Sequence, residues 1–230
     1  MTESVAVQFK HLFPVFPLPE TMLLPHAIMP LSIFEPRYRQ MVDHAIDGSG
    51  QIAIATMQRI NKQNEDGMGV SLRDVVCLGQ IVQHEKARHG YNILVYGLCR
   101  GLILETHDPD ASRLYSTAKL KPIEIIDDEV NDLYRDELRK LLDRPNLRRL
   151  EHRGSIVQWL DEPELSTLAL FELIGCSLFD DSELRYELLA EPSCELRTLR
   201  LLSELKKLDR LLKMTDRQSQ ARWEKGVSWN

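Results

Sequence analysis

The stretch FPLPETMLLP at residues 16–25, followed by MPLSIFEPRYRQM at residues 29–41, decides the fold of this chain. Prolines recur through both parts, at positions 17, 19, 25, 30 and 36. Because proline has no backbone N–H, a strand that contains it pairs only along an edge or at an irregular position of a sheet. We therefore expect a stiff, apolar ribbon at the surface of a sheet, and not a fully paired central strand.

The second part of this stretch predicts a helix at residues 36–46. Pro36 suits the first helical turn, where its missing N–H costs nothing. The apolar stripe at helical spacing consists of Tyr38, Met41, Val42, Ala45 and Ile46. Asp47-Gly48 predicts the end of the helix.

Short apolar runs rich in β-branched residues surround this helix and predict strands. They cover residues 28–33, 52–57, 75–83, 91–98, 102–106 and 114–125. Arg88-His89-Gly90 is typical of a hairpin turn, and residues 61–69 are typical of a loop. The spacing of these runs predicts a small closed or half-closed β-barrel.

Beyond residue 125 the apolar period becomes helical. The last predicted helix begins near Pro192 and carries Leu201, Leu205, Leu208 and Leu212 at near-heptad spacing. Short loops between the predicted helices favour antiparallel packing. The predicted fold class is therefore α+β, with a β-barrel and its inserted helix at residues 10–125, a helical bundle at 126–214 and a flexible tail at 215–230.

The two quoted parts, together with Leu78-Gly79-Gln80-Ile81 and Gly90-Tyr91-Asn92-Ile93, resemble the N-terminal, substrate-binding domain family of Lon-type proteases. The resemblance covers about residues 12–212. It implies a PUA-like β-barrel followed by helices, and a role in recognising polypeptide segments, often unfolded ones. The sequence departs from the family pattern at Leu24-Pro25-His26, where Phe-Pro-Gly is usual, and at Arg185-Tyr186, where Lys-Gln is expected.

In full-length Lon proteases an ATPase module and a protease module follow this domain. The present sequence has no GxxxxGK[ST] motif and no Gly-Lys dipeptide, so it predicts no P-loop, and we expect the chain to end before either module. The resemblance thus implies a stand-alone, non-enzymatic polypeptide-binding module, such as an adaptor or chaperone-like binder, without a cofactor. The sequence leaves open the oligomeric state and whether a separate protease or chaperone is a partner.

Four residues of the resembling segments are the candidate peptide contacts: Phe16, Leu24, Phe34 and Tyr38. In the functional interpretation they line an exposed apolar groove for an extended peptide, and a sheet edge with free backbone groups offers strand addition. In the structural interpretation they belong to the core of a rigid segment.

Glu35, Arg37 and Arg100 are the charged residues of the matched segments. Glu35 precedes a predicted helix N-terminus, where negative charge is favourable. We expect a structural ion pair between Glu35 and one of the arginines that holds the helix to the barrel. A catalytic carboxylate would need a second acid, a base or a metal nearby, and the sequence offers none.

The string His84-Glu85-Lys86-Ala87-Arg88-His89 is one residue longer than the zinc motif HExxH. Two histidines at this separation lie roughly 140° apart around a helix, and the predicted setting is a hairpin. We therefore expect no metal site. The four cysteines contain no CxxC pair, which favours reduced thiols in a cytoplasmic protein.

The formal net charge is −6, and residues 1–122 hold 12 basic and 12 acidic residues, so the acidic excess falls on the remainder. This distribution makes RNA binding, known for other PUA-like barrels, the less favoured alternative. The sequence also lacks the run of roughly 18 apolar residues that a membrane-spanning helix needs.

Overall fold

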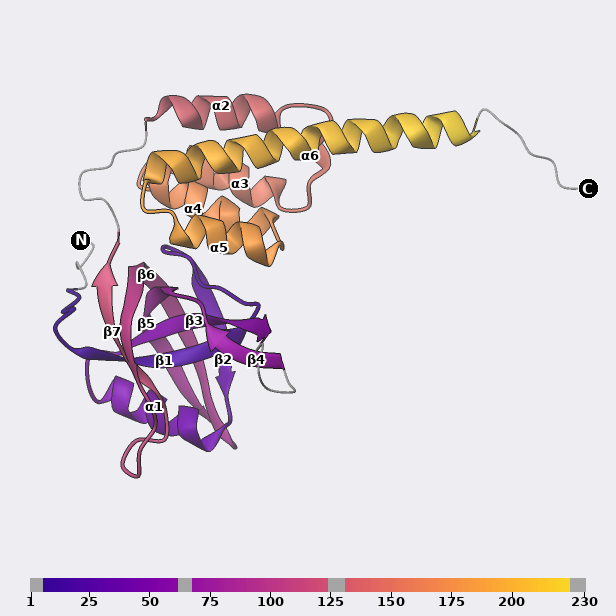
Figure 1. The fold of residues 1–230 in the computed structure, drawn as a ribbon. Helices are drawn as coiled ribbons and strands as arrows, with labels where there is room; N and C mark the ends of the chain where they lie inside the picture. Colours follow the sequence, from indigo (N-terminus) through magenta and orange to yellow (C-terminus); the bar gives the residue numbers. More distant parts are fainter. Residues whose placement is uncertain (1–5, 62–67, 124–130, 224–230) are drawn as a thin grey trace, which may run out of the picture. The chain divides into compact units, whose positions relative to one another are not determined.

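The computed structural model describes residues 6–61, 68–123 and 131–223 (Figure 1). Contacts within the chain divide it into two compact units. The first unit joins residues 1–126 with residues 179–192, and the second joins residues 127–178 with residues 193–230.

The described part of the first unit contains seven strands and two helices. They are β1 (Leu12–Pro19), β2 (Ile28–Ile33), α1 (Pro36–Ile46), β3 (Gln51–Asn61), β4 (Met68–Leu72), β5 (Val75–Ala87), β6 (Gly90–His107), β7 (Thr117–Pro122) and α5 (Ser182–Ala190). The α+β fold class and the inserted helix at residues 36–46 are confirmed.

The strand pairings close into a ring. Strand β1 pairs antiparallel with β7 through Leu12–Pro14 and parallel with β3 through Val15–Pro19. The remaining neighbours, β7–β6, β6–β5 and β5–β3, are antiparallel. Five strands therefore form a closed barrel, and closure leaves no free edge within the ring.

The proline-rich β1 is thus part of the barrel wall and not the surface ribbon that its prolines predicted. Its first half pairs with β7 and its second half with β3, so the two registers do not overlap. Pro17 and Pro19 lie in the half that pairs with β3, where only one ladder needs donors. This arrangement is how a strand with several prolines joins a barrel.

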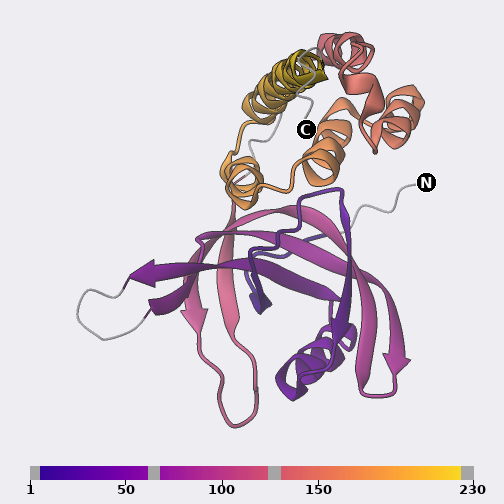
Figure 2. The ribbon, with the colours of Figure 1, turned by 90° about the vertical axis from the view of Figure 1, so that its right-hand side faces the viewer.

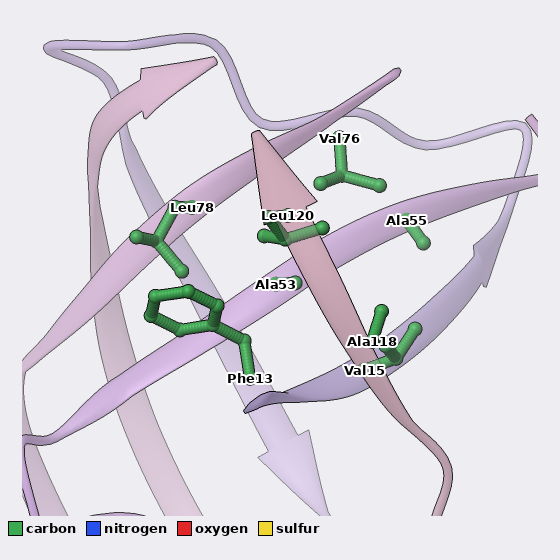
Figure 3. Close-up of a cluster of buried hydrophobic side chains, with 8 residues drawn as sticks. All are labelled: Phe13, Val15, Ala53, Ala55, Val76, Leu78, Ala118 and Leu120. Atoms are coloured by element: carbon green, nitrogen blue, oxygen red, sulfur yellow. The ribbon is translucent and has the colours of Figure 1, made fainter. Parts of the chain in front are cut away.

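The barrel interior is filled by alternate side chains of four strands (Figure 3). These buried residues are Phe13 and Val15 from β1, Ala53 and Ala55 from β3, Val76 and Leu78 from β5, and Ala118 and Leu120 from β7. Each pair is two positions apart, as required for side chains on one face of a strand. The alanines of β3 and β7 leave room for the Phe13 ring.

Helix α5 is grouped with the barrel, whereas the sequence placed residues 126–214 in one bundle. Asp181 caps this helix by accepting hydrogen bonds from the backbone N–H groups of Glu183 and Leu184. The Tyr186 hydroxyl accepts a hydrogen bond from the Val75 N–H at 3.2 Å, and the Arg73 guanidinium lies 4.1 Å from the Tyr186 ring centre. Arg185-Tyr186, the unusual pair noted above, therefore supplies the side chain that attaches α5 to β5.

The second unit contains α2 (Leu133–Leu142), the 3-10 helix η1 (Leu147–Arg149), α3 (Arg153–Asp161), α4 (Thr167–Leu178) and α6 (Cys194–Trp223). Leu138, Leu141 and Phe171 are buried in its core. A buried ion pair joins Arg197 Nε to Glu172 Oε1 at 2.8 Å. Helix α6 continues to Trp223, beyond the predicted start of a tail at residue 215, and residues 224–230 lie outside the described part.

Two strand predictions differ from the structure. Strands expected at residues 91–98 and 102–106 are one strand, β6, because Cys99, Arg100 and Gly101 pair with Leu78, Cys77 and Val76 of β5. The predicted loop at residues 61–69 includes the start of β4, which pairs with β3. Residues 62–67 lie outside the described part.

Candidate peptide-binding surface

Beyond the barrel, β5 and β6 continue as a hairpin that carries β2 on one side (Figure 2). Strand β2 pairs antiparallel with β6, from Ile28 opposite Tyr96 to Ile33 opposite Tyr91. The chain thereby forms a three-stranded extension in the order β5-β6-β2, with β2 at its margin. The two faces of this extension differ in their surroundings.

The inner face of the extension is packed. Ile33, Ile93 and Val95 are buried there. The Tyr91 hydroxyl donates a hydrogen bond to the Asp43 carboxylate of α1. This hydrogen bond, with a smaller contribution from burial, raises the pKa of Tyr91 above its ordinary value. Helix α1 is therefore attached directly to this face.

The outer face carries exposed apolar side chains. Residues at alternate positions of β2, continued by the residue after Ile33, form what we call the β2 row, which consists of Ile28, Pro30, Ser32 and Phe34. Ile28 is 60% exposed and Phe34 is 70% exposed. Side chains two positions apart in a strand share a face, so the row presents large apolar groups to solvent.

A groove of about 530 Å³ runs beside the β2 row. Its lining residues are Pro30, Leu31, Ser32, Gln83, Glu85, Asn92, Ile93 and Leu94. Ser32 Oγ donates a hydrogen bond to Asn92 Oδ1 at 3.0 Å across the two strands. Glu85 is the one charged side chain in this lining, so the groove combines an apolar floor with polar groups and a single negative charge.

The structure places three of the four candidate contacts in the core. Leu24 is 0% exposed, Phe16 is 7% exposed and Tyr38 is 8% exposed. The Phe16 and Tyr38 rings pack edge to face with their centres 4.7 Å apart, which attaches α1 to β1. Phe34 alone among the four is at the surface, so the structural interpretation holds for the other three.

The charged candidates lie in two places. Arg37 Nη2 is 2.8 Å from Glu35 Oε2, and both side chains are largely exposed, so this pair contributes little to stability. Arg100 is buried on β6, and its Nη2 donates a 3.4 Å hydrogen bond to the Leu188 carbonyl of α5. Arg100 therefore helps to attach α5 to the barrel, and the ion pair belongs to the start of α1.

Comparison with known proteins identifies the family. The family model described as the ATP-dependent protease La (LON) substrate-binding domain matches residues 13–207. The chain belongs to this family. A comparison with curated proteins gave no match.

Two solved Lon N-terminal domains are similar in structure. The N-terminal domain of Mycobacterium avium complex Lon protease has a TM-score of 0.62 and 19% sequence identity, and the match covers 85% of this chain and 98% of that chain. The Lon N-terminal domain protein from Xanthomonas campestris has a TM-score of 0.57 and 18% identity, covering 84% of this chain and 98% of that chain. At these identities the two structures support the fold alone.

The backbone is unusual just before β2. His26, at the departure from the resembling pattern noted above, has a φ of +66°. This left-handed conformation is costly for residues with a Cβ atom and easy for glycine. The His26 N–H donates to the Gly97 carbonyl at 2.9 Å, and its Nδ1 lies 3.1 Å from the Tyr96 hydroxyl. These contacts hold the turn that leads from buried Leu24 to exposed Ile28.

The sequence did not single out Ile28, Leu94 or the groove that Leu94 lines. The alternation of Ile28, Pro30, Ser32 and Phe34 was the available signal, but it indicates which residues share a face and not which face is buried. The face that is buried is decided by the pairing of β2 with β6, which is distant in sequence.

The described residues of the first unit also form a second groove, with more charged side chains in its lining. This groove, of about 460 Å³, is lined partly by Glu20, Arg73 and Glu183, and Arg73 forms an ion pair with Glu183. His84 lies on β5 and His89 in the turn before β6, as the hairpin prediction expected. Across residues 6–61, 68–123 and 131–223, no group of three or more His, Cys, Asp or Glu side chains is placed to hold a metal ion. No helix in those ranges has the length and hydropathy to cross a membrane.

Proposed function

We propose that this chain binds polypeptide segments, including unfolded ones, on the β2 row and in the groove beside it, and that it does so without catalysing a reaction. The observation that carries the proposal is the exposure of Ile28 and Phe34 beside a groove of about 530 Å³. The chain's membership in a family of substrate-binding domains supports the same proposal.

The size of the apolar surface is sufficient for weak, general recognition. Burying a large apolar side chain yields roughly 1.5–3 kcal/mol, so Ile28 and Phe34 together can contribute about 3–6 of the roughly 8 kcal/mol of a micromolar interaction. Such binding favours clients that expose large apolar side chains, as unfolded segments do. This chemistry suits an adaptor or chaperone-like role alongside a separate protease or chaperone, which stays a proposal, and the cytoplasmic location stays a prediction.

RNA binding is the less favoured function. The groove contains Glu85 and no basic residue, and the whole chain has a net charge of −6. Phosphate recognition depends on lysine and arginine side chains, which this surface does not concentrate.

The direct test uses a second protein as the client, reduced and carboxymethylated so that it stays unfolded. Fluorescence anisotropy of the labelled client follows its binding to this chain. Ile28→Ser combined with Phe34→Ser should weaken binding by ~10- to 100-fold, because two apolar contacts are lost. Leu104→Ser is the matched control, because Leu104 is 54% exposed on β6 and does not line the groove. It should bind as the wild type does.

Thermal unfolding of both variants checks that the fold is intact. The proposal fails if the wild type does not bind the unfolded protein, or if the double variant binds it as tightly as the Leu104→Ser control.

A further inference from the structure

The hydrogen-bond pattern of β2 shows which of its backbone groups face away from β6. The Gly97 N–H donates to the Ala27 carbonyl at 2.9 Å, and the Gly97 carbonyl accepts from the His26 N–H, so the Ala27 carbonyl faces β6. In an antiparallel ladder bonded and non-bonded pairs alternate. With Ile28 opposite Tyr96, the bonded positions of β2 are therefore Met29, Leu31 and Ile33.

The remaining positions of β2 point their N–H and C=O groups outward. They are Ile28, Pro30 and Ser32, and all three are exposed. Within the described part of the chain, β6 is the one strand that pairs with β2. Pro30 occupies an outward position, where its missing N–H removes no bond to β6, as expected for proline on an edge strand.

We propose that an extended polypeptide segment adds to β2 as a fourth strand of the β5-β6-β2 extension; this inference rests on the proposed function and specifies how the segment is held. The N–H groups of Ile28 and Ser32 and the carbonyls of Ile28, Pro30 and Ser32 pair with the backbone of the segment. Pro30 offers a carbonyl and no donor, so the ladder has one gap at its centre.

The β2 row then sets the side-chain pattern of the bound segment. Apolar side chains at alternate positions of the added strand lie beside Ile28 and Pro30 on the outer face. The bound segment is thus an extended stretch in which apolar residues alternate with polar ones.

Amide hydrogen exchange measured by NMR tests this arrangement on the unmodified protein. The probe is a blocked heptapeptide that alternates valine with lysine. Saturating peptide should slow exchange of the Ile28 and Ser32 amides by ~10-fold or more, because each gains a strand partner. The Leu31 amide, already paired with β6, is the internal control and should not change.

A pair of variants at one position provides an independent measurement. Ser32→Pro removes one outward donor and should weaken peptide binding by ~3- to 10-fold. Ser32→Val keeps that donor and changes only the side chain, so it should bind within ~2-fold of the wild type. Thermal unfolding of the two variants shows whether Ser32→Pro keeps the fold, and the exchange measurement does not depend on either variant.

The outcomes separate this inference from the proposed function. If the peptide binds and the double variant Ile28→Ser, Phe34→Ser loses binding, but the wild-type Ile28 and Ser32 amides exchange as fast as before, strand addition is overturned and the proposed function stands. Slow exchange of these amides in the free protein, together with a dimer in light scattering, assigns the edge to a second copy of this chain and also overturns the inference. If the wild type binds neither this peptide nor the unfolded protein, the proposed function itself fails.

Discussion

The two faces of the β5-β6-β2 extension use the same kind of residue for opposite purposes. On the inner face Ile33 and Val95 are buried against the body of the first unit. On the outer face Ile28 and Phe34, which belong to the same short stretch of sequence, are largely exposed. Residues next to each other in sequence thus either stabilise the fold or remain available to a partner.

This difference shows that the apolar residues of the proline-rich stretch have separable roles. Phe16, Leu24 and Tyr38 are buried in the core, and the contact between the Phe16 and Tyr38 rings joins β1 to α1. Phe34 contributes no comparable packing. Substitutions in the two groups should therefore have distinct effects, one on stability and the other on binding.

The largest expected effect is on the free energy of unfolding, and it should differ between substitutions of Phe16 and of Phe34. Phe16→Ala should lower the free energy of unfolding by about 3–5 kcal/mol, because it leaves a cavity beside Tyr38. Phe34→Ala, at an exposed position, should change it by less than about 0.5 kcal/mol. Urea denaturation followed by circular dichroism measures both values. Equal losses for the two variants would show that Phe34 is packed and would remove the distinction between the faces.

A smaller effect is expected at the turn that leads from the buried to the exposed part of the stretch. His26→Ala and His26→Gly both lose the Tyr96 contact, but only the alanine variant keeps a Cβ atom in the left-handed region. The alanine variant should therefore be less stable than the glycine variant by about 1 kcal/mol. Thermal or urea unfolding of the pair gives the comparison. An alanine variant that is the more stable one would mean that the turn imposes no cost on a side chain.

The smallest effect concerns the attachment of the inner face to α1. The hydrogen bond to Asp43 raises the pKa of Tyr91 above its ordinary value of 10.0. Because the folded-state pKa is raised, this contribution is fully present below pH 10 and is lost as the pH rises through the folded-state pKa. The advantage of the wild type over Tyr91→Phe should thus disappear at high pH. Unfolding measured from about pH 8 to about pH 11 checks this, and an advantage that does not change with pH would contradict it.

Much of the fold was predictable because its signals are local. The helix at residues 36–46 follows from Pro36 and an apolar stripe, and the hairpin before Gly90 follows from turn residues. The parallel pairing of β1 with β3 carries no local signal, since it joins Val15 to Ala53 across strand β2 and helix α1. For the same reason the sequence did not show that β1 is part of the barrel wall.

The candidate site was harder to predict than the fold. Phe16 and Phe34 both belong to proline-rich apolar runs, and composition does not distinguish them. Their exposure depends on which face each strand turns toward the core, and this is decided by the register of β1 and β2 with distant strands. The family resemblance pointed to this stretch of sequence without identifying which of its side chains reach the surface.

The most direct test of the central claim maps the contact of an unfolded client onto the first unit. Methyl signals of Ile28 and Leu94, on the outer face, should shift when a reduced, carboxymethylated protein is titrated into the labelled chain. Signals of Met22 and Met57, which line the second groove, should stay unchanged. Shifts confined to Met22 and Met57, with none at Ile28 or Leu94, would contradict the account.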